Sequence, residues 1–213
     1  MTEALHSPPT PFSLLLVGAG GHGRVVADAA LRQARWPLIR ATDRDPARCQ
    51  GELLPGVALL AEDAAHALQT SVHIAIGHNA ARAWEVRQWG EGRLMSVIHP
   101  GAWVSPFSTL GPGSFVAAGA VLAPMARTGV ACIVNHLAVV DHDVVLGDYC
   151  HIAPGARLGG GVVVGRRVLV GTGAVLLPGV QVADDVVIGA GAVVRQSLPE
   201  AGTYVGVPAR KIP

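Results

Sequence analysis

Two different patterns of hydrophobic positions divide the chain near residue 100. In the first part, short apolar runs that predict buried strands alternate with amphipathic stretches that predict helices. The expected strands are 14–17, 38–42, 72–76 and 94–98, and the expected helices are 23–35 and 79–89. This alternation is typical of a small parallel α/β domain. We therefore expect such a domain over residues 12–100, preceded by a flexible, proline-rich lead-in at residues 1–11.

From residue 101 to residue 213 the pattern is different, because an aliphatic residue recurs at every sixth position. The series runs from Val104 to Val194, and Thr128 is its one polar member. A six-residue period is the signature of a parallel β-helix, in which three six-residue faces make one coil and the aliphatic side chains form a ladder inside. A β-sandwich would instead alternate with period two. The sequence thus predicts an α/β plus all-β protein, and the general crossover rule favours a right-handed coil.

Composition and charge exclude several classes of partner. The formal net charge is +1 at pH 7 and no basic run occurs, so nucleic acid is not expected as a partner. No membrane association is expected either, because no segment is long and apolar enough to span a bilayer and the N-terminus lacks the regions of a signal peptide. The three widely spaced cysteines contain no CxxC pair and predict reduced packing residues in a cytoplasmic protein.

A glycine-rich loop at residues 18–23 follows the first expected strand and opens the first expected helix. Its sequence, GAGGHG, satisfies G-x-G-x-x-G, the pattern that lets a phosphate approach a helix N-terminus. Asp43, at the end of the second expected strand, is placed to meet a ribose. An NAD-dependent oxidoreductase is therefore one hypothesis. Against it, the α/β part is too short for two mononucleotide-binding halves and a catalytic domain.

His142 lies between Asp141 and Asp143, and a histidine beside a carboxylate can serve as a general base. Eighteen residues make one coil, so Gly160 is expected one coil above His142, where a missing side chain leaves room for a substrate. His151 and His136 are the second and third candidates for the base. The histidines show neither the i, i+4 helical spacing nor the Cys/His cluster of a zinc site, so no metal is expected.

Several motifs occur together in a fixed order. They are VGAGGHGRVV near the start, IAIGHN at 74–79, IHPGAWVSP at the junction, VDHDVVLGDYCHIAPGA in the hexad region and VGVPARK at the end. With the hexad between them, the chain resembles the nucleotide-sugar acetyltransferases of the sialic acid O-acetyltransferase family, in the hexapeptide-repeat superfamily. These include bacterial enzymes that N-acetylate UDP-4-amino sugars and GDP-perosamine. The resemblance extends from residue 14 to about residue 211.

This resemblance implies a Rossmann-like domain, a left-handed parallel β-helix and a homotrimer with active sites between subunits. It implies transfer of acetyl from acetyl-CoA to the amino group of a UDP- or GDP-linked 4-amino-4,6-dideoxy sugar in surface polysaccharide synthesis. Sugar O-acetylation and a non-catalytic scaffold are the alternatives.

The resemblance also implies roles for individual residues. The expected general base is His142, with Asp143 as its partner; some relatives have the longer Glu at that position. Residues expected near the nucleotide sugar are Gly20, His22, Asp43, Gly77, His78, Asn79 and Asn135. Residues expected near acetyl-CoA are His151, Gly160, Ala190, Arg210 and Lys211.

Overall fold

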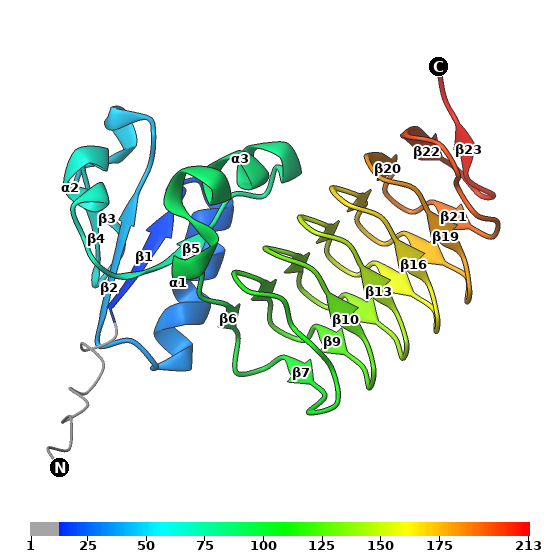
Figure 1. Cartoon of the computed structure of the whole chain (residues 1–213), viewed down its shortest axis with the longest axis horizontal. Helices are drawn as coiled ribbons and strands as arrows, with labels where there is room; N and C mark the ends of the chain where they lie inside the picture. Colours follow the sequence, from blue (N-terminus) through cyan, green and yellow to red (C-terminus); the bar gives the residue numbers. More distant parts are fainter. Residues whose placement is uncertain (1–12) are drawn as a thin grey trace, which may run out of the picture.

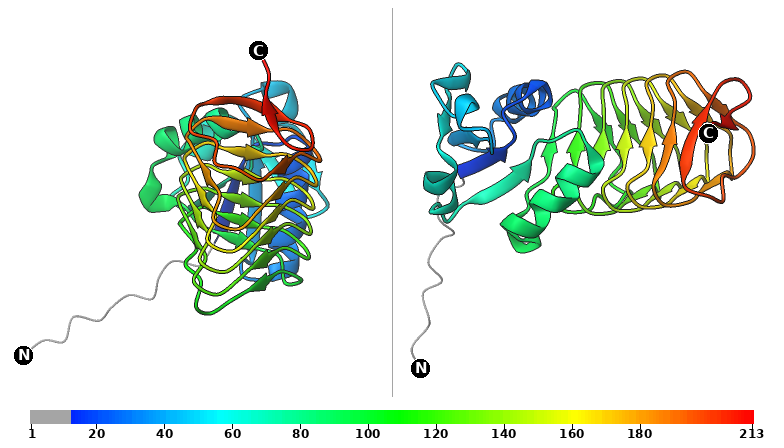
Figure 2. Two further views of the ribbon diagram at one scale, coloured as in Figure 1. Left: turned by 90° about the vertical axis from the view of Figure 1, so that its right-hand side faces the viewer. Right: turned by 90° about the horizontal axis from the view of Figure 1, so that it is seen from above.

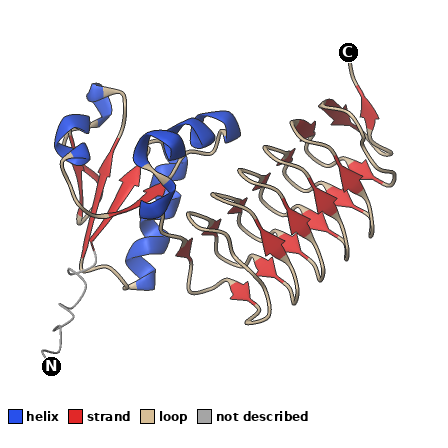
Figure 3. Cartoon of the chain, in the orientation of Figure 1, coloured by secondary structure: helices blue, strands red, loops and turns tan. Residues whose placement is uncertain are grey.

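The computed structural model describes residues 13–213, and the expected lead-in at 1–11 lies outside the described residues. An α/β domain and a stack of coils follow one another along the long axis of the molecule (Figure 1). Helices occur in the α/β domain, and short strands joined by loops make up the coils (Figure 3). Both predicted parts of the fold are therefore confirmed.

The α/β domain is a five-stranded sheet in the order β3-β4-β2-β1-β5. Its strands are β1 (Ser13–Val17), β2 (Leu38–Thr42), β3 (Glu52–Leu54), β4 (Val57–Leu60) and β5 (Ser71–Ile74), of which only β3 runs antiparallel to its neighbour. Its helices are α1 (Gly21–Gln33), α2 (Glu62–His66) and α3 (Asn79–Trp89), with 3-10 turns at Pro46–Arg48 and Glu91–Arg93. The sequence pattern missed β3, β4 and α2, because each is too short to show a period.

The segment predicted as a strand at 94–98 is divided between the two domains. Leu94 bridges Val72 of the α/β domain, whereas β6 (Val97–Ile98) pairs with β8 (Phe115–Val116) of the coil. The first coil therefore starts at Val97, ahead of the boundary expected at residue 101. The chain moves directly from one sheet to the other without a linker.

The coils form a parallel β-helix with three faces, seen along its axis and from above in Figure 2. Face 1 contains β6, β8, β11 (Ile133–Val134), β14 (His151–Ile152), β17 (Leu169–Val170), β20 (Val186–Ile188) and β22 (Gly202–Val205), with β23 (Arg210–Lys211) at its end. Face 2 contains β7 (Trp103–Val104), β9 (Val121–Leu122), β12 (Val139–Val140), β15 (Arg157–Leu158), β18 (Val175–Leu176) and β21 (Val193–Val194). Face 3 contains β10 (Arg127–Thr128), β13 (Val145–Leu146), β16 (Val163–Val164) and β19 (Gln181–Val182).

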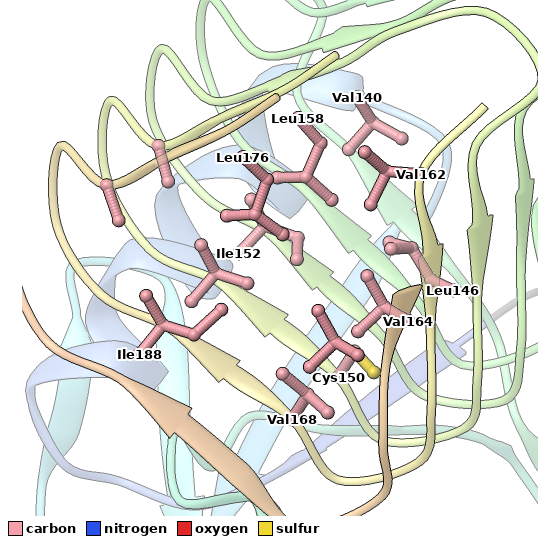
Figure 4. Packing of buried hydrophobic residues seen from close by; sticks show 14 of the residues in the cluster. Val140, Leu146, Cys150, Ile152, Leu158, Val162, Val164, Val168, Leu176 and Ile188 are labelled. Carbon is pink, nitrogen blue, oxygen red and sulfur yellow. The ribbon is translucent and has the colours of Figure 1, made fainter. Parts of the chain in front are cut away.

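The register between coils is eighteen residues. Ile133 pairs with His151, and Val139 pairs with Arg157. The predicted ladder fills the interior, where Val140, Leu158 and Leu176 stack along face 2 (Figure 4). Thr128 tolerates its buried ladder position because its hydroxyl accepts a hydrogen bond from the Gly111 amide at 2.9 Å.

The two domains share a core. Phe115 and Ile133, on the outer side of face 1, pack in one cluster with Val26 and Ala29 of α1. Because this apolar surface is buried between the domains, the α/β domain is fixed on the first coils of face 1.

Candidate active site

The glycine loop has two glycines that the backbone requires. Gly18 has φ +117°, and a Cβ there would lie 2.8 Å from the carbonyl oxygen of Ala75. A Cβ at Gly23 would collide with the carbonyl oxygen of Gly18. Gly20 immediately precedes α1 and has only the Arg48 guanidinium nearby, 3.5 Å from a built Cβ. The loop thus leaves the α1 N-terminus open to a phosphate.

Asp43 is bonded to the glycine loop itself. Its carboxylate accepts hydrogen bonds from the backbone amides of Ala19 at 2.7 Å and Asp45 at 3.0 Å. Arg48, which no sequence motif marks, has its guanidinium 4.0 Å from the same carboxylate. Asp43 therefore positions the loop, and Arg48 supplies a positive charge beside Gly20.

His22, Gly77, Asn135 and His151 meet where the domains join, and we call them the junction cluster. Nδ1 of His151 lies 3.1 Å from the Gly77 carbonyl oxygen, and Nε2 lies 3.1 Å from Nδ2 of Asn135. The rings of His22 and His151 are 6.1 Å apart. Residues separated by more than one hundred positions in the sequence thus form one polar group.

Both histidines of the junction cluster are neutral near pH 7. Burial, together with the positive charges of neighbouring groups, lowers the pKa of His22 to about 3 and that of His151 to about 4. Nε2 of His22 is buried and has no hydrogen-bond partner within the described residues. His22 Nε2 is therefore an unsatisfied polar atom enclosed where the domains join.

The turn predicted to meet the nucleotide lies against the β-helix. His78 caps α3, because its Nδ1 accepts from the Ala81 amide at 3.2 Å. Asn79 donates to the carbonyl oxygen of Arg167 at 3.0 Å and accepts from Arg82 at 2.8 Å. The bond from Asn79 to Arg167 joins the domains, and of this turn Gly77 belongs to the junction cluster. Arg82 had no signal in the sequence, since it occupies an ordinary helical position.

His142 and Asp143 lie at a different place, the corner that follows β12. Nδ1 of His142 is 2.8 Å from the Asp143 carboxylate, and the Asp141 carboxylate accepts from the His142 amide at 2.7 Å. Asp143 has φ +60°, which turns its short side chain back toward the ring. The hydrogen bond to Asp143 and the charge of Asp141 raise the pKa of His142. Its side chain is 62 % exposed, so Nε2 is free to take a proton.

Gly160 is one coil above His142, at the place that the eighteen-residue count predicts. The Gly161 amide donates to the His142 carbonyl oxygen at 2.9 Å, and the Gly179 amide donates to that of Gly160 at 3.0 Å. A Cβ on Gly160 would overlap the imidazole of His142. The space left by the missing side chain is therefore filled by the His142 ring itself, and room for a substrate beside this exposed ring stays a prediction.

The candidate residues fall into two corners on either side of face 2. We call the corner after face 1 corner 1–2; it stacks Ala118, His136, Pro154, Thr172 and Ala190, at eighteen-residue steps. The corner after face 2 is corner 2–3, and it holds His142, Asp143 and Gly160. Asn135 precedes β12 and His142 follows it, so one chain does not bring the junction cluster and the base together.

Three expected acetyl-CoA ligands lie toward the far end of the β-helix. Ala190 follows β20, and its backbone amide donates no hydrogen bond within residues 13–213. Arg210 and Lys211 form β23, beside the C-terminus (Figure 1). Lys211 is paired with Glu200 at 2.9 Å, whereas Arg210 donates only to the neighbouring Ala209 carbonyl oxygen. Of these two cations, Arg210 is thus the freer to meet a phosphate.

A pocket of about 310 Å³ adjoins the junction cluster. It lies between α1 and corner 1–2, and its apolar wall includes Val25, Leu54 and Phe115. Arg24 and His136 add polar groups to this wall. The size of this pocket and its mixture of apolar and polar lining residues are typical of small-molecule binding sites.

Comparisons with known proteins place both domains in one family. Residues 13–88 match the PglD N-terminal domain, and residues 161–196 match the bacterial transferase hexapeptide repeat. The acetyltransferase domain of PglB from Neisseria gonorrhoeae is 34 % identical, with 94 % of this chain and 99 % of that chain covered and a TM-score of 0.88. PerB from Caulobacter crescentus, solved with CoA and GDP-perosamine, is 36 % identical over 94 % of this chain and 97 % of that chain, with a TM-score of 0.86.

The fold and the site define an acyltransferase of the hexapeptide-repeat class. The chain belongs to the hexapeptide-repeat family of sugar acetyltransferases that includes the PglB domain and perosamine N-acetyltransferase.

Two kinds of feature are absent from residues 13–213, the part of the chain that the structure describes. No group of three or more His, Cys, Asp or Glu side chains gathers there in a way that would hold a metal ion. None of the helices in this part is long and apolar enough to cross a membrane.

Proposed function

We propose that the chain transfers the acetyl group of acetyl-CoA to the amino group of a nucleotide-linked amino sugar, with His142 as the general base. The observation that carries the proposal is the exposed His142–Asp143 pair, in a chain whose relatives are sugar N-acetyltransferases. The relative crystallised with CoA and GDP-perosamine supports this pair of substrates.

The chemistry is a direct transfer. The sugar amine attacks the thioester carbonyl, and His142 Nε2 accepts the proton that the amine loses. The C–S bond then breaks, and the proton passes to the departing CoA sulfur, giving an amide and free CoA. Asp143 holds the Nδ1 proton of the ring, which keeps the lone pair on Nε2. The free amide of Ala190 lies three coils beyond His136 and is a donor for the arm of acetyl-CoA, away from the thioester.

The nucleotide sugar binds at the α/β domain in this proposal. The open α1 N-terminus at Gly20 and the charge of Arg48 suit its diphosphate. His22 and Asn135 of the junction cluster, with the adjoining pocket, suit its sugar, and His151 of the same cluster lies toward the thioester. Acetyl-CoA lies along the β-helix toward Ala190 and Arg210.

The active site is completed by a second copy of the chain, because corner 1–2 and corner 2–3 are separated by face 2. Large exposed apolar side chains border this face: Trp103, Phe107, Met125 and Leu137 are 54 %, 71 %, 49 % and 65 % exposed. Burying them against another copy brings corner 2–3 of one chain to corner 1–2 of the next. Three copies joined by such contacts close into a ring, which is a homotrimer.

Turnover tests the reaction. Acetyl-CoA is supplied with a panel of nucleotide amino sugars and their hydroxyl counterparts, and thiol release is measured. Thiol release is expected with the amino sugars and not with their hydroxyl counterparts. Thiol release only with a hydroxyl sugar would assign O-acetylation instead.

Mixed trimers test the shared site. Gly20→Trp should lose nucleotide-sugar binding and keep acetyl-CoA binding, while His142→Ala should bind both substrates. Coexpression of the two variants should restore activity that neither shows alone, since some interfaces then pair an intact corner 2–3 with an intact glycine loop. A monomeric mass in light scattering, or no restoration, would refute the shared site.

A further inference from the structure

Arg82 is a charged side chain buried where the two domains meet. It lies on α3, and the residue is only 1 % exposed. All three of its guanidinium nitrogens donate hydrogen bonds. The acceptors are the carbonyl oxygens of Ile76, Gly77, Ala131, Tyr149 and Cys150, and the side-chain oxygen of Asn79.

Three of these acceptors belong to residues that are bonded to His151 or directly precede it. Nη1 of Arg82 donates to the Gly77 carbonyl oxygen at 3.0 Å, the same oxygen that Nδ1 of His151 meets at 3.1 Å. Nη2 donates to the carbonyl oxygens of Tyr149 at 2.7 Å and Cys150 at 3.2 Å. Tyr149 and Cys150 directly precede His151. One guanidinium therefore fixes both the backbone that carries the ring and the oxygen to which the ring is bonded.

The bond to Gly77 determines the tautomer of His151. A carbonyl oxygen only accepts, so Nδ1 must carry the proton, and in a neutral ring Nε2 then has a lone pair. That lone pair accepts from Nδ2 of Asn135, whose side-chain oxygen accepts from the His136 amide at 2.8 Å. The amide of Asn135 is thereby held in one orientation, with its second N–H left for a ligand.

Arg82 also favours the neutral form of this ring. Burial is the main reason that the pKa of His151 is lowered to about 4, and the positive charge of Arg82 is the second. A neutral His151 bonded on both nitrogens is a fixed structural element of the site and not a proton carrier.

We propose that Arg82 is a positioning residue for acetyl transfer, which holds His151 in its Nδ1-protonated tautomer and, through it, orients the Asn135 amide. This inference rests on the proposed function, in which His151 lies by the thioester and Asn135 by the sugar. Lysine cannot replace Arg82, because an ammonium has three N–H groups and no planar fork to reach six acceptors.

The test combines imidazole NMR with kinetics on the full-length protein. Selective ¹⁵N-histidine labelling reports which ring nitrogen is protonated, and the His151 signals are assigned by their loss in His151→Ala. Arg82→Lys is compared with Arg93→Lys. Arg93 is the matched control, because it also donates to backbone carbonyls, those of Leu68 and Thr70, but does not touch the junction cluster.

At pH 7 the parent protein should show His151 protonated on Nδ1 alone. Arg82→Lys should give mixed tautomers or a partly charged ring and raise the KM for acetyl-CoA about tenfold, with a smaller change in kcat. Arg93→Lys should leave both readouts unchanged.

Three results would overturn the proposal: a parent His151 protonated on Nε2 or charged at pH 7, an unchanged tautomer in folded Arg82→Lys, or a changed tautomer with unchanged kinetics. The first result needs only the parent protein, so it can overturn the proposal even where Arg82→Lys does not fold. If the parent protein acetylates no nucleotide amino sugar, the proposed function fails, while the NMR comparison still decides whether Arg82 sets the tautomer of His151.

Discussion

Two histidines nine residues apart, His142 and His151, have opposite environments in the same β-helix. His142 stands exposed at a corner beside two carboxylates, and its pKa is raised. His151 is enclosed at the domain junction, and burial with the charge of Arg82 lowers its pKa to about 4. The difference shows that position on the coil, not residue type, separates an exposed histidine with a raised pKa from a buried, neutral one.

The largest expected effect comes from removing the base. His142→Ala should lower kcat by about 10²–10⁴-fold while both substrates still bind, since the imidazole acts on a proton in transit. His151→Ala, its matched comparison, should act mainly on the KM for acetyl-CoA. Steady-state kinetics with both substrates varied checks this. If the two variants exchange these behaviours, the base has been assigned to the wrong histidine.

Displacing the ring of His142 should have the next largest effect. Gly160→Leu places side-chain atoms where the imidazole lies, and a base moved by about 1 Å is expected to cost about 10²-fold in kcat. Gly92→Ala is the control, because a Cβ there meets nothing within 4 Å. Circular dichroism should show that both variants remain folded. Full turnover by Gly160→Leu would mean that the ring need not lie over Gly160.

Asp143→Asn should have a smaller effect on rate and a clear effect on pH dependence. The Asp143 carboxylate is the main cause of the raised His142 pKa, so its removal lowers that pKa. The acid limb in the pH profile of kcat should therefore move to lower pH. In His142→Ala this limb should vanish, and a limb that belongs to protonation of the sugar amine should remain. Identical acid limbs in the parent and in Asp143→Asn would contradict the pairing.

The smallest expected effect concerns stability in acid. His73 is buried on β5, and burial lowers its pKa as it does those of His22 and His151. His22, His73 and His151 have folded-state pKa values of about 3, 4 and 4, below the ordinary value of 6.5. The unfolded chain therefore binds more protons below pH 6.5, and stability should fall as the pH drops from about 6.5 toward 4. Thermal melts across this range check it. His142→Ala should melt with much the same acid dependence, because the exposed His142 is not among these groups.

The sequence predicted the β-helix because the six-residue period relates residues that are close together in the chain. A ladder residue every six positions must lie on one side of each face, and eighteen residues must complete a coil, so the spacing alone places Gly160 over His142. The same count did not show that the His142 ring fills the space over Gly160, since a side-chain rotamer depends on its neighbours. The His142–Asp143 pair was likewise visible, because adjacent residues need no fold to meet.

The sequence alone therefore determined the two domains, the coil repeat and the corner that carries His142. Only the tertiary structure decided the junction cluster, in which Gly77 and His151 are 74 positions apart and share a hydrogen bond. It also gave Arg82 a role that no pattern marks, because a buried guanidinium is defined by the six acceptors around it. A repeat is encoded in neighbouring residues, whereas such a contact exists only after two separately folded surfaces have packed together.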